Sequence, residues 1–430
     1  MSAKFLDSPP ACIANHETFF QTRGTNGAAE ATHAAVNGRV VPIDQLTDDD
    51  VRAWRDLAER AIEPNPLFEW ECLIPTARHL SHETPISLVI AEDDGRFFGC
   101  FPVRRVAGDA RPSTTWSGVG RPVLSTQVRR LDYDGTPLVS EERGVEAATA
   151  MLSAIVARAR AEGAGILVFE ALDADGPVSS YFAIAAKKLK LPTHIYRTWE
   201  RPTVRRRDSL VYRSSHGSAY LRKIAKWSRQ LGDKLGGDVQ FVDRSADASA
   251  VEELIAMEAA GYKLENGVAL VSHPGEPEWF REMCAHFRES GRLLVYSLQV
   301  GDSVVAMDLS LRAGEGLFGL LGAYDEDYSR FAPGIQLWFE VIERFHNETD
   351  ARWLDSCTYA GNETLLRLLP DRRTVSTVLV AVGGPLARWR FRLYATALDA
   401  FGVGSTFRSR HPRACGALDR VLVKLGLLSF

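Results

Sequence analysis

The chain has 430 residues, of which 45% are hydrophobic and 25% charged, and a formal net charge of −4. This composition indicates a folded globular protein of two or three domains and argues against a dedicated nucleic-acid-binding protein. Six widely spaced cysteines without a Cys-x-x-Cys pair argue against a disulfide framework or a zinc site. Because neither a signal peptide nor a transmembrane run is apparent, we expect a cytoplasmic protein with no integral membrane segment. We also expect no bound metal.

Residues 1–38 are rich in Ala, Thr, Asn and Gly without hydrophobic periodicity, which predicts a disordered tail. Strand and helix patterns follow in the order strand, two helices, two strands, helix, strand, helix and strand. We assign them to one α/β domain over residues 39–204. The predicted elements are 39–43, 48–61, 68–80, 86–92, 96–106, 141–162, 166–171, 179–189 and 194–200.

The same order of elements returns over residues 205–384, after a basic helix, and predicts a second α/β domain. Residues 385–430 contain aromatic side chains and an amphipathic end at 418–428, which predicts a helical C-terminal extension. We expect this extension to dock on the domains, although subunit pairing and contact with a membrane surface fit the same pattern. The elements of the second half are 218–235, 239–242, 248–260, 276–290, 293–300, 303–312, 316–323, 333–346, 352–356, a helix from 362, and 375–382.

The turn Pro333-Gly334 lies between the third strand of the second half and an amphipathic helix. Proline favours the first turn of a helix, and glycine lacks the Cβ that would keep a ligand away from the backbone. The N–H groups of residues 334–337 are therefore predicted to bind an anion such as a pyrophosphate at the positive end of the helix. An ordinary tight turn without a ligand fits the same residues.

This order of elements, with an anion-binding turn after the third strand of a meander, resembles the GNAT acyltransferase fold. Particular segments are similar to the branch that contains CelD-like proteins and Fem-type aminoacyltransferases. The resemblance covers roughly residues 40–385, is best over 215–383, and implies two tandem GNAT-like domains with a mixed α/β sheet. The first domain is expected to be degenerate because it lacks the Pro-Gly turn. The similar residues are Asn65–Phe68, Gly135–Leu138, Lys223–Leu231, Met257–Lys263, Tyr324, Tyr328, Pro333, Gly334, Leu337, Leu354–Cys357 and Leu369–Arg373.

For the turn, the resemblance implies a co-substrate, acetyl-CoA or another acyl-CoA. Many GNAT enzymes carry an Arg/Gln-x-x-Gly-x-Gly/Ala loop at this place. Here Pro333 and Ile335 stand where small residues are expected, which predicts fewer N–H donors for the pyrophosphate. The candidate donor-binding residues are Arg330, Pro333, Gly334, Ile335, Gln336 and Leu337.

Acyl transfer to an amine requires a base for the amine and a proton for the leaving thiolate. Tyr324, at the end of the third strand, is the candidate proton donor, and a packed tyrosine with a hydrogen-bonded hydroxyl fits equally. Asp308 lies within an apolar strand, where burial would raise its pKa toward that of a base, and a structural salt bridge is the alternative. Asp355, at the end of the next strand, is a third catalytic candidate.

Substrate-binding candidates lie in two places. Glu258, Tyr262 and Lys263 are on or just after a helix that would border the acceptor, and a solvated helix surface has the same spacing. The segment 197–234 contains eleven Lys/Arg against three Asp/Glu. This basic segment would suit an anionic acceptor, the phosphates of CoA or the acceptor stem of a tRNA, and a solvated linker helix fits as well. Its candidate residues are Arg222, Lys223 and Lys226.

The resemblance implies an N-acyltransferase that moves acetyl or another small acyl group from acyl-CoA to an amine. The acceptor it implies is an amino sugar or another precursor of a cell-envelope polysaccharide. Two other functions fit. One is Fem-like aminoacyl transfer from aminoacyl-tRNA, the only case in which a nucleic acid would be a partner, and the other is a non-catalytic scaffold in polysaccharide assembly.

Overall fold

A computed structural model describes residues 35–81, 84–106, 123–129, 134–358 and 362–400. The predicted tail of residues 1–38 lies outside this range except at its end, where the first strand already begins at Asn37. The predicted amphipathic end at 418–428 also lies outside it. None of the helices in the described part is long and apolar enough to cross a membrane.

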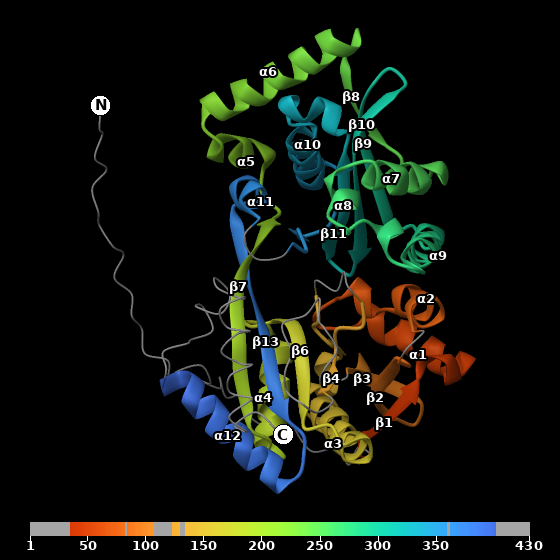
Figure 1. Cartoon of the computed structure of the whole chain (residues 1–430), viewed down its shortest axis with the longest axis vertical. Helices are drawn as coiled ribbons and strands as arrows, with labels where there is room; N and C mark the ends of the chain where they lie inside the picture. Colours follow the sequence, from red (N-terminus) through yellow and green to blue (C-terminus); the bar gives the residue numbers. More distant parts are fainter. Residues whose placement is uncertain (1–34, 82–83, 107–122, 130–133, 359–361, 401–430) are drawn as a thin grey trace. The chain divides into compact units, whose positions relative to one another are not determined.

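The first half follows the predicted order of elements, except that two short strands, β4 and β5, which were not predicted, lie between β3 and α3 (Figure 1). The first helix begins at a capping box, in which Thr47 and Asp50 satisfy each other's backbone N–H groups. The third ends at Gly163, whose left-handed conformation closes the helix. The elements are β1 (Asn37–Pro42), α1 (Asp48–Glu59), α2 (Trp70–Leu80), β2 (Ser87–Asp93), β3 (Arg96–Val106), β4 (Val123–Ser125), β5 (Leu138–Val139), α3 (Gly144–Glu162), β6 (Ile166–Asp173), α4 (Pro177–Lys188) and β7 (Thr193–Arg205).

The second half repeats this order, and a C-terminal helix follows it as predicted. The basic helix has the predicted bounds, and its C-terminal cap is the left-handed Gly236. The elements are α5 (Ser209–Ser215), α6 (Ser218–Leu235), β8 (Val239–Asp243), α7 (Ser249–Ala259), α8 (Tyr262–Glu265), α9 (Glu276–Glu289), β9 (Leu293–Val300), β10 (Ser303–Ala313), β11 (Gly316–Tyr324), the 3₁₀ helix η5 (Glu326–Phe331), α10 (Pro333–Asn347), β12 (Trp353–Asp355), α11 (Glu363–Leu368), β13 (Asp371–Ala381) and α12 (Pro385–Ala400).

The strands form a mixed sheet in the order β1-β2-β3-β4-β6-β13-β7-β12-β11-β10-β9-β8, with β5 beside β3. The pairs β4–β6 and β11–β12 are parallel and the other pairs are antiparallel. The runs β1-β2-β3-β4-β6 and β8-β9-β10-β11-β12 therefore have matching topology. The fold is the predicted mixed α/β arrangement of two GNAT-like units in tandem.

Strands β7 and β13 are exchanged between the two units. β13, which belongs to the second half by sequence, lies between β6 and β7 (Figure 1). β7 also pairs with β12. The predicted division between residues 204 and 205 falls near the end of β7, and it stays a prediction. Both strands are longer than predicted, because their polar ends at Arg201–Arg205 and Asp371–Thr374 also pair in the sheet.

Helices cover both faces of the sheet. Leu309 and Leu311 of β10 point toward α7 and α9, whereas Ala306 lies on the other face among side chains of α10. The predicted docking of the C-terminal extension is seen in α12. Phe391 and Tyr394 of this helix are buried against β6, β7 and β13, on the face opposite α3 and α4.

Buried charges also join α2 of the first half to the second half. Arg292, just before β9, forms ion pairs with Glu69 and Glu71, both of which are buried. Burial raises the pKa of Glu69 to about 7, although the charge of Arg292 opposes that rise. The two carboxylates therefore depend on one guanidinium for their counter-ion.

Replacing Arg292 by Ala should lower the free energy of unfolding by about 3–5 kcal/mol, because two buried carboxylates lose their partner. A carboxyl whose pKa is raised on folding makes the folded state less stable as the pH rises through that pKa. The decrease in the free energy of unfolding caused by the Arg292 replacement should therefore be larger at pH 8 than at pH 5. Urea unfolding at both pH values measures this. Arg281→Ala on α9, which breaks an exposed pair with Glu252, is the control and should cost less than about 1 kcal/mol.

Candidate active site

The end of β11 is separated from its neighbour. β12 pairs with β11 only from Gly316 to Phe318, and Gly319–Tyr324 continue without a strand partner on that side among the described residues. β11 then leads through η5 into α10. The free edge of β11 and the first turn of α10 therefore belong to one continuous segment of the chain.

The predicted anion turn is more constrained than the sequence indicated. The N–H groups of Ile335 and Gln336 both donate to the carbonyl of Ala332, at 3.0 and 3.2 Å. The Gln336 side chain donates to the carbonyl of Phe331 at 2.8 Å, and the side chains of Gln336 and Leu337 are buried. The expectation of four free N–H groups is therefore wrong for Ile335 and Gln336, because the first turn closes on itself. Gly334 precedes the first intrahelical bond, so its N–H is directed outward along the helix.

Ala332, which caps α10, has an unusual backbone conformation. Its φ is +50°, in the left-handed region that favours glycine. Arg330, two residues earlier, is exposed and places its guanidinium 4.5 Å from the centre of the Phe331 ring. The turn is thus held in a conformation that costs energy for an alanine, as often occurs at ligand-binding turns.

Tyr324 lies directly beside the Pro-Gly turn. A Cβ added to Gly334 would be 3.4 Å from Cδ1 of Tyr324, which is ordinary van der Waals contact. Tyr324 is half-buried and its ring packs against the cluster around α10. The structure therefore brings the predicted proton donor to the predicted donor site.

Asp308 lies on the same sheet face as Tyr324. In the ladder, Asp308 is opposite Gly322 and Ala306 is opposite Tyr324, so Asp308 and Tyr324 are diagonal neighbours, about 7–8 Å apart. Ser310 donates to Oδ2 of Asp308 at 3.2 Å. A Cβ on Gly322 would come within 3.1 Å of Oδ1, so only a glycine leaves this oxygen room. Gly322 itself is exposed, which places the buried carboxylate just behind an open piece of backbone.

The pKa of Asp308 is raised to about 7, chiefly because burial disfavours the charged carboxylate. The hydrogen bond from Ser310 and the charge of Lys263 oppose this rise. A carboxylate with such a pKa exchanges protons near neutral pH. The environment predicted for Asp308 is confirmed, and its catalytic role stays a prediction.

Lys263 and Glu258 meet at this end of β11. Lys263 Nζ lies 2.9 Å from the carbonyl oxygen of Gly322 and 3.3 Å from Oε1 of Glu258. The other oxygen of Glu258 accepts the N–H of Leu270 at 2.9 Å, and Glu258 is buried. Glu258 is therefore not part of a solvated helix surface. Its contacts hold Lys263 and the loop after α8 in place.

Tyr262 links α8 to the segment before α10. Its N–H donates to Oε1 of Glu326 at 2.7 Å, while its ring is 49% exposed. The three candidates Glu258, Tyr262 and Lys263 thus border the end of β11 and η5. Their predicted role in substrate binding is compatible with this position and stays a prediction.

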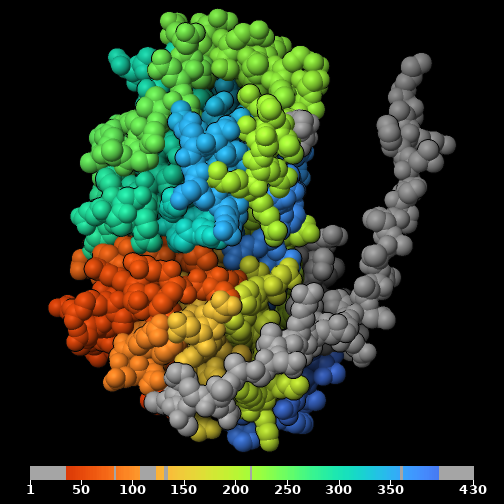
Figure 2. Space-filling view, turned by 180° about the vertical axis from the view of Figure 1, so that it is seen from behind, coloured from red at the N-terminus to blue at the C-terminus, as the bar shows by residue number. Residues whose placement is uncertain are grey.

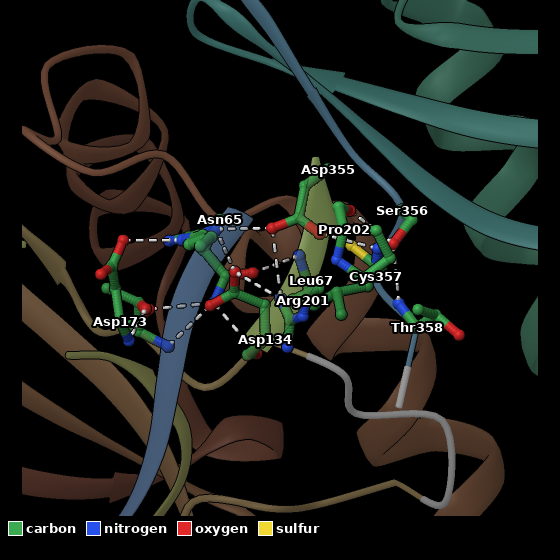
Figure 3. A network of polar contacts seen from close by, with 12 residues as sticks. Asn65, Leu67, Asp134, Asp173, Arg201, Pro202, Asp355, Ser356, Cys357 and Thr358 are labelled. Carbon is green, nitrogen blue, oxygen red and sulfur yellow. Dashed lines mark hydrogen bonds and ion pairs between the residues drawn. The ribbon is translucent and has the colours of Figure 1, made fainter. Parts of the chain in front are cut away.

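Asp355 occupies a different environment, which Figure 3 shows. It is fully buried and lies 2.9 Å from a guanidinium nitrogen of Arg373 and 3.3 Å from one of Arg201. Burial alone would raise its pKa, but these two charges and the N–H of Cys357 outweigh burial and lower it. A buried carboxylate with a lowered pKa is a poor base. The contacts favour the structural salt bridge for Asp355.

The basic segment divides into structural and exposed residues. Arg206 donates to the carbonyls of Phe345, His346 and Ala351 at the end of α10, and Arg207 pairs with Asp371. Those two arginines stabilise a helix end and a strand end. Exposed cations lie along α6, which Figure 2 shows in green at the surface. They include the predicted Arg222, Lys223 and Lys226, and the opposite face of α6 packs on the cluster around α10.

Sequence reasoning missed Ser310, Gly322 and Ala332. Ser310 could have been predicted from the sequence, since it is two residues from Asp308 on the same strand and shares its face. Gly322, a glycine inside a strand pattern, is a signal for close approach of another group. Nothing in the sequence marks the left-handed conformation of Ala332. The described residues contain no group of three or more His, Cys, Asp and Glu side chains that could hold a metal.

Comparison with known proteins bears on the same region. Residues 218–365 match the family model described as an acetyltransferase (GNAT) domain. This segment, about a third of the chain, is therefore similar to a GNAT domain. The match begins with α6 and ends in α11, so it contains Asp308, Tyr324 and the α10 turn.

Solved structures have a similar fold over most of the chain. FemX is 10% identical, with a TM-score of 0.53, and the match covers 78% of this chain and 96% of FemX. A conserved protein of unknown function from Bacteroides thetaiotaomicron is 12% identical, with a TM-score of 0.50 over 79% of this chain and 99% of that one. No curated protein matches the chain. The likeness to FemX agrees with the predicted Fem-type resemblance, and at these identities it concerns the fold alone.

Replacing Ala332 by Gly should stabilise the protein by about 0.5–1 kcal/mol. The left-handed conformation costs an alanine about 1–2 kcal/mol, and the greater freedom of glycine in the unfolded chain offsets part of that gain. Urea or thermal unfolding measures the change. Ala248→Gly is the matched control, because Ala248 caps α7 at φ −65° and its replacement should destabilise. Equal destabilisation by both variants would contradict the strain at Ala332.

Proposed function

We propose that the second GNAT-like unit transfers an acyl group from an acyl-CoA to an amine. The observation that carries this proposal is the convergence of three residues at the free end of β11. Gly334 of the α10 turn lies beside Tyr324, since a Cβ at Gly334 would be 3.4 Å from Cδ1 of that ring, and Asp308 is the diagonal neighbour of Tyr324 on the same face. This arrangement supports the proposal, because a donor at the turn, an acid and a base would lie within reach of one substrate.

The donor would approach along the edge of β11 that β12 leaves free. Its pyrophosphate would lie at the first turn of α10, where Gly334 supplies an N–H and the helix supplies a positive end. Arg330, which is exposed beside the turn, would add a cation for a phosphate. The thioester would lie beside the unpaired backbone of β11, whose N–H groups are suited to its carbonyl oxygen.

The reaction needs a base at the acceptor amine and an acid at the leaving thiolate. Asp308, in its ionised form, takes a proton from the ammonium of the acceptor, and the free amine attacks the thioester carbon. When the carbon–sulfur bond breaks, the hydroxyl of Tyr324 gives its proton to the leaving thiolate. The nitrogen loses its second proton as the amide forms, and this proton restores the hydroxyl of Tyr324. Because the pKa of Asp308 is about 7, its charged form is populated at neutral pH. This carboxylate is also a stronger base than one with an ordinary pKa.

The amine would enter on the side of Glu258 and Lys263. Lys263 binds the backbone of Gly322, which lies opposite Asp308, and Glu258 fixes Lys263. Tyr262 exposes its ring nearby and would supply a flat apolar surface. An amino sugar or another polyhydroxylated precursor of a cell-envelope polysaccharide, met in the cytoplasm, suits a site with aromatic and polar contacts.

A second function deserves the same test because several exposed cations lie on α6. Arg222, Lys223 and Lys226 would suit a polyanion, and a tRNA acceptor stem in Fem-like aminoacyl transfer is one. Thermal unfolding with acetyl-CoA, longer acyl-CoAs and aminoacyl-tRNA separates these donors. A ligand present at 100 times its Kd stabilises the folded state by about 2.7 kcal/mol. Stabilisation by none of them would favour the non-catalytic scaffold.

Gly334→Val should weaken acyl-CoA binding by about tenfold or more, because the side chain would occupy the space of the pyrophosphate at the turn. Gly334→Ala should fold normally, since its Cβ would only touch Tyr324. Isothermal titration with CoA and acetyl-CoA measures the effect. Gly217→Val is the control, because Gly217 caps α6 and a Cβ there meets no atom within 4 Å. Unchanged CoA affinity in a folded Gly334→Val protein would place the donor elsewhere.

Asp308→Asn should lower kcat by about a hundredfold and remove the rise of kcat/KM with pH near 7. In the parent protein that rise reflects loss of a proton from a carboxyl whose pKa is about 7. A carboxyl with a raised pKa destabilises the fold once it is charged, so the Asn variant should be at least as stable as the parent at pH 8. Activity and stability are therefore expected to change in opposite directions.

Two further variants serve as controls for that experiment. Tyr324→Phe should also lower kcat while it keeps the pH dependence of kcat/KM that Asp308 produces. Asp355→Asn should lower stability, because Arg201 and Arg373 lose a buried partner, but it should leave that pH dependence in place. A normal pH profile for Asp308→Asn, with chemistry as the slow step, would rule out Asp308 as the base.

A further inference from the structure

The outer face of α12 presents three large apolar side chains to solvent. Leu386, Trp389 and Leu393 are 61%, 55% and 45% exposed, and their spacing of three and four residues places them on one stripe of the helix. The inner face is already occupied by Phe391 and Tyr394, which pack on the sheet. The exposed stripe therefore takes no part in holding α12 to the fold.

Positive charge surrounds this stripe. Arg388, Arg390 and Arg392 come from α12 itself, and the exposed Arg160 comes from the last turn of α3. Burial, and then the like charges of Arg160 and Arg392, lower the pKa of Arg388, so these guanidinium groups are close enough to repel one another. Within the part of the chain that the structure describes, no carboxylate forms an ion pair with Arg160, Arg388 or Arg392. A cationic patch thus lies beside an apolar one.

Charge decides among the surfaces that could cover this face. Residues 385–430 contain eight Lys/Arg and two Asp/Glu. Five of those Lys/Arg and one of those Asp/Glu lie in 401–430. If segment 401–430 or the α12 of a second copy lay over the stripe, like charges would be brought together. A surface with negative charge outside and an apolar interior matches both the cationic patch and the apolar stripe. An anionic bilayer has this chemistry, since tryptophan and leucine enter the interface while arginines reach the head groups.

We propose that α12 docks the protein on the surface of a membrane rich in anionic phospholipid. Leu386, Trp389 and Leu393 enter the boundary between head groups and acyl chains, and Arg388, Arg390, Arg392 and Arg160 contact the phosphates. The helix lies in the plane of the surface, because its inner face stays packed on the sheet. The site is separate from Asp308 and the α10 turn, so this inference does not depend on the proposed acyl transfer.

Co-sedimentation of the full chain with vesicles tests the proposal. Vesicles of phosphatidylcholine with phosphatidylglycerol should bind the protein, and vesicles of phosphatidylcholine alone should bind it weakly. Binding should fall at high salt, because part of it is electrostatic. The triple variant Leu386→Ser, Trp389→Ser, Leu393→Ser should lower the partition coefficient by about tenfold or more. Arg160→Glu with Arg392→Glu should lower it for the anionic vesicles only.

The controls keep each outcome decisive. Leu210→Ser with Val211→Ser removes apolar groups of α5 that are 72% and 55% exposed, and it should leave vesicle binding unchanged. A chain that ends at residue 400 should still bind, and loss of binding there would assign it to segment 401–430 instead of α12. Sedimentation velocity detects a dimer. A dimer that the triple variant dissociates, without vesicle binding by the parent, would make this face a subunit interface. Equal vesicle binding by parent and triple variant, with unchanged thermal unfolding, would also overturn the proposal.

Discussion

The exchange of β7 and β13 brings together five charged side chains that are buried or half-buried where the two units meet. Asp134 and Asp173 come from the first half, Asp355 from β12, Arg201 from β7 and Arg373 from β13. Desolvating such groups costs several kcal/mol each, and the cost is met only if each carboxylate keeps a guanidinium beside it. Three aspartates against two arginines leave an excess of negative charge. Together with burial, the charges of Asp173 and Asp134 raise the pKa of the neighbouring Glu63 to about 8, so this carboxyl is largely protonated at neutral pH.

This network also shapes the candidate active site, which contains none of its members. Asp355 ends β12, and its Oδ1 accepts the N–H of Cys357 at 2.8 Å, in a turn where Cys357 has a φ of +47°. The serine between them donates its hydroxyl to the carbonyl of Pro202. β12 is thereby turned away after three residues, and β11 continues without it. The free edge beside Asp308 and Tyr324 thus follows from where the buried charges fix β12.

Local patterns predicted the elements because each depends on neighbours in sequence. The bounds of α6 and α10, the strands 293–300 and 303–312 and the environment of Asp308 all follow from a pattern within about ten residues. The strand exchange was beyond such patterns, since the pairing of Thr193 with Val380 joins residues far apart in the chain. The polar ends of β7 and β13 were missed for the same reason. Arg201 and Arg373 resemble solvated residues until their partners Asp134 and Asp355 are known.

The two units share one topology and differ at the helix that follows their fourth strand. In the second unit, α10 begins with Pro333-Gly334, and no acidic residue lies in its first turn. In the first unit, the corresponding helix α3 begins at Gly144. The ring of Tyr181 occupies the space that a Cβ on Gly144 would fill. Glu141, Glu142 and Glu146 lie at that end of the helix, where they occupy the positive pole and repel an anion. Both units have the sheet, whereas one helix start has no acidic residue in its first turn and the other is closed by a side chain and by negative charge. That contrast explains in physical terms why the donor site is expected in the second unit alone.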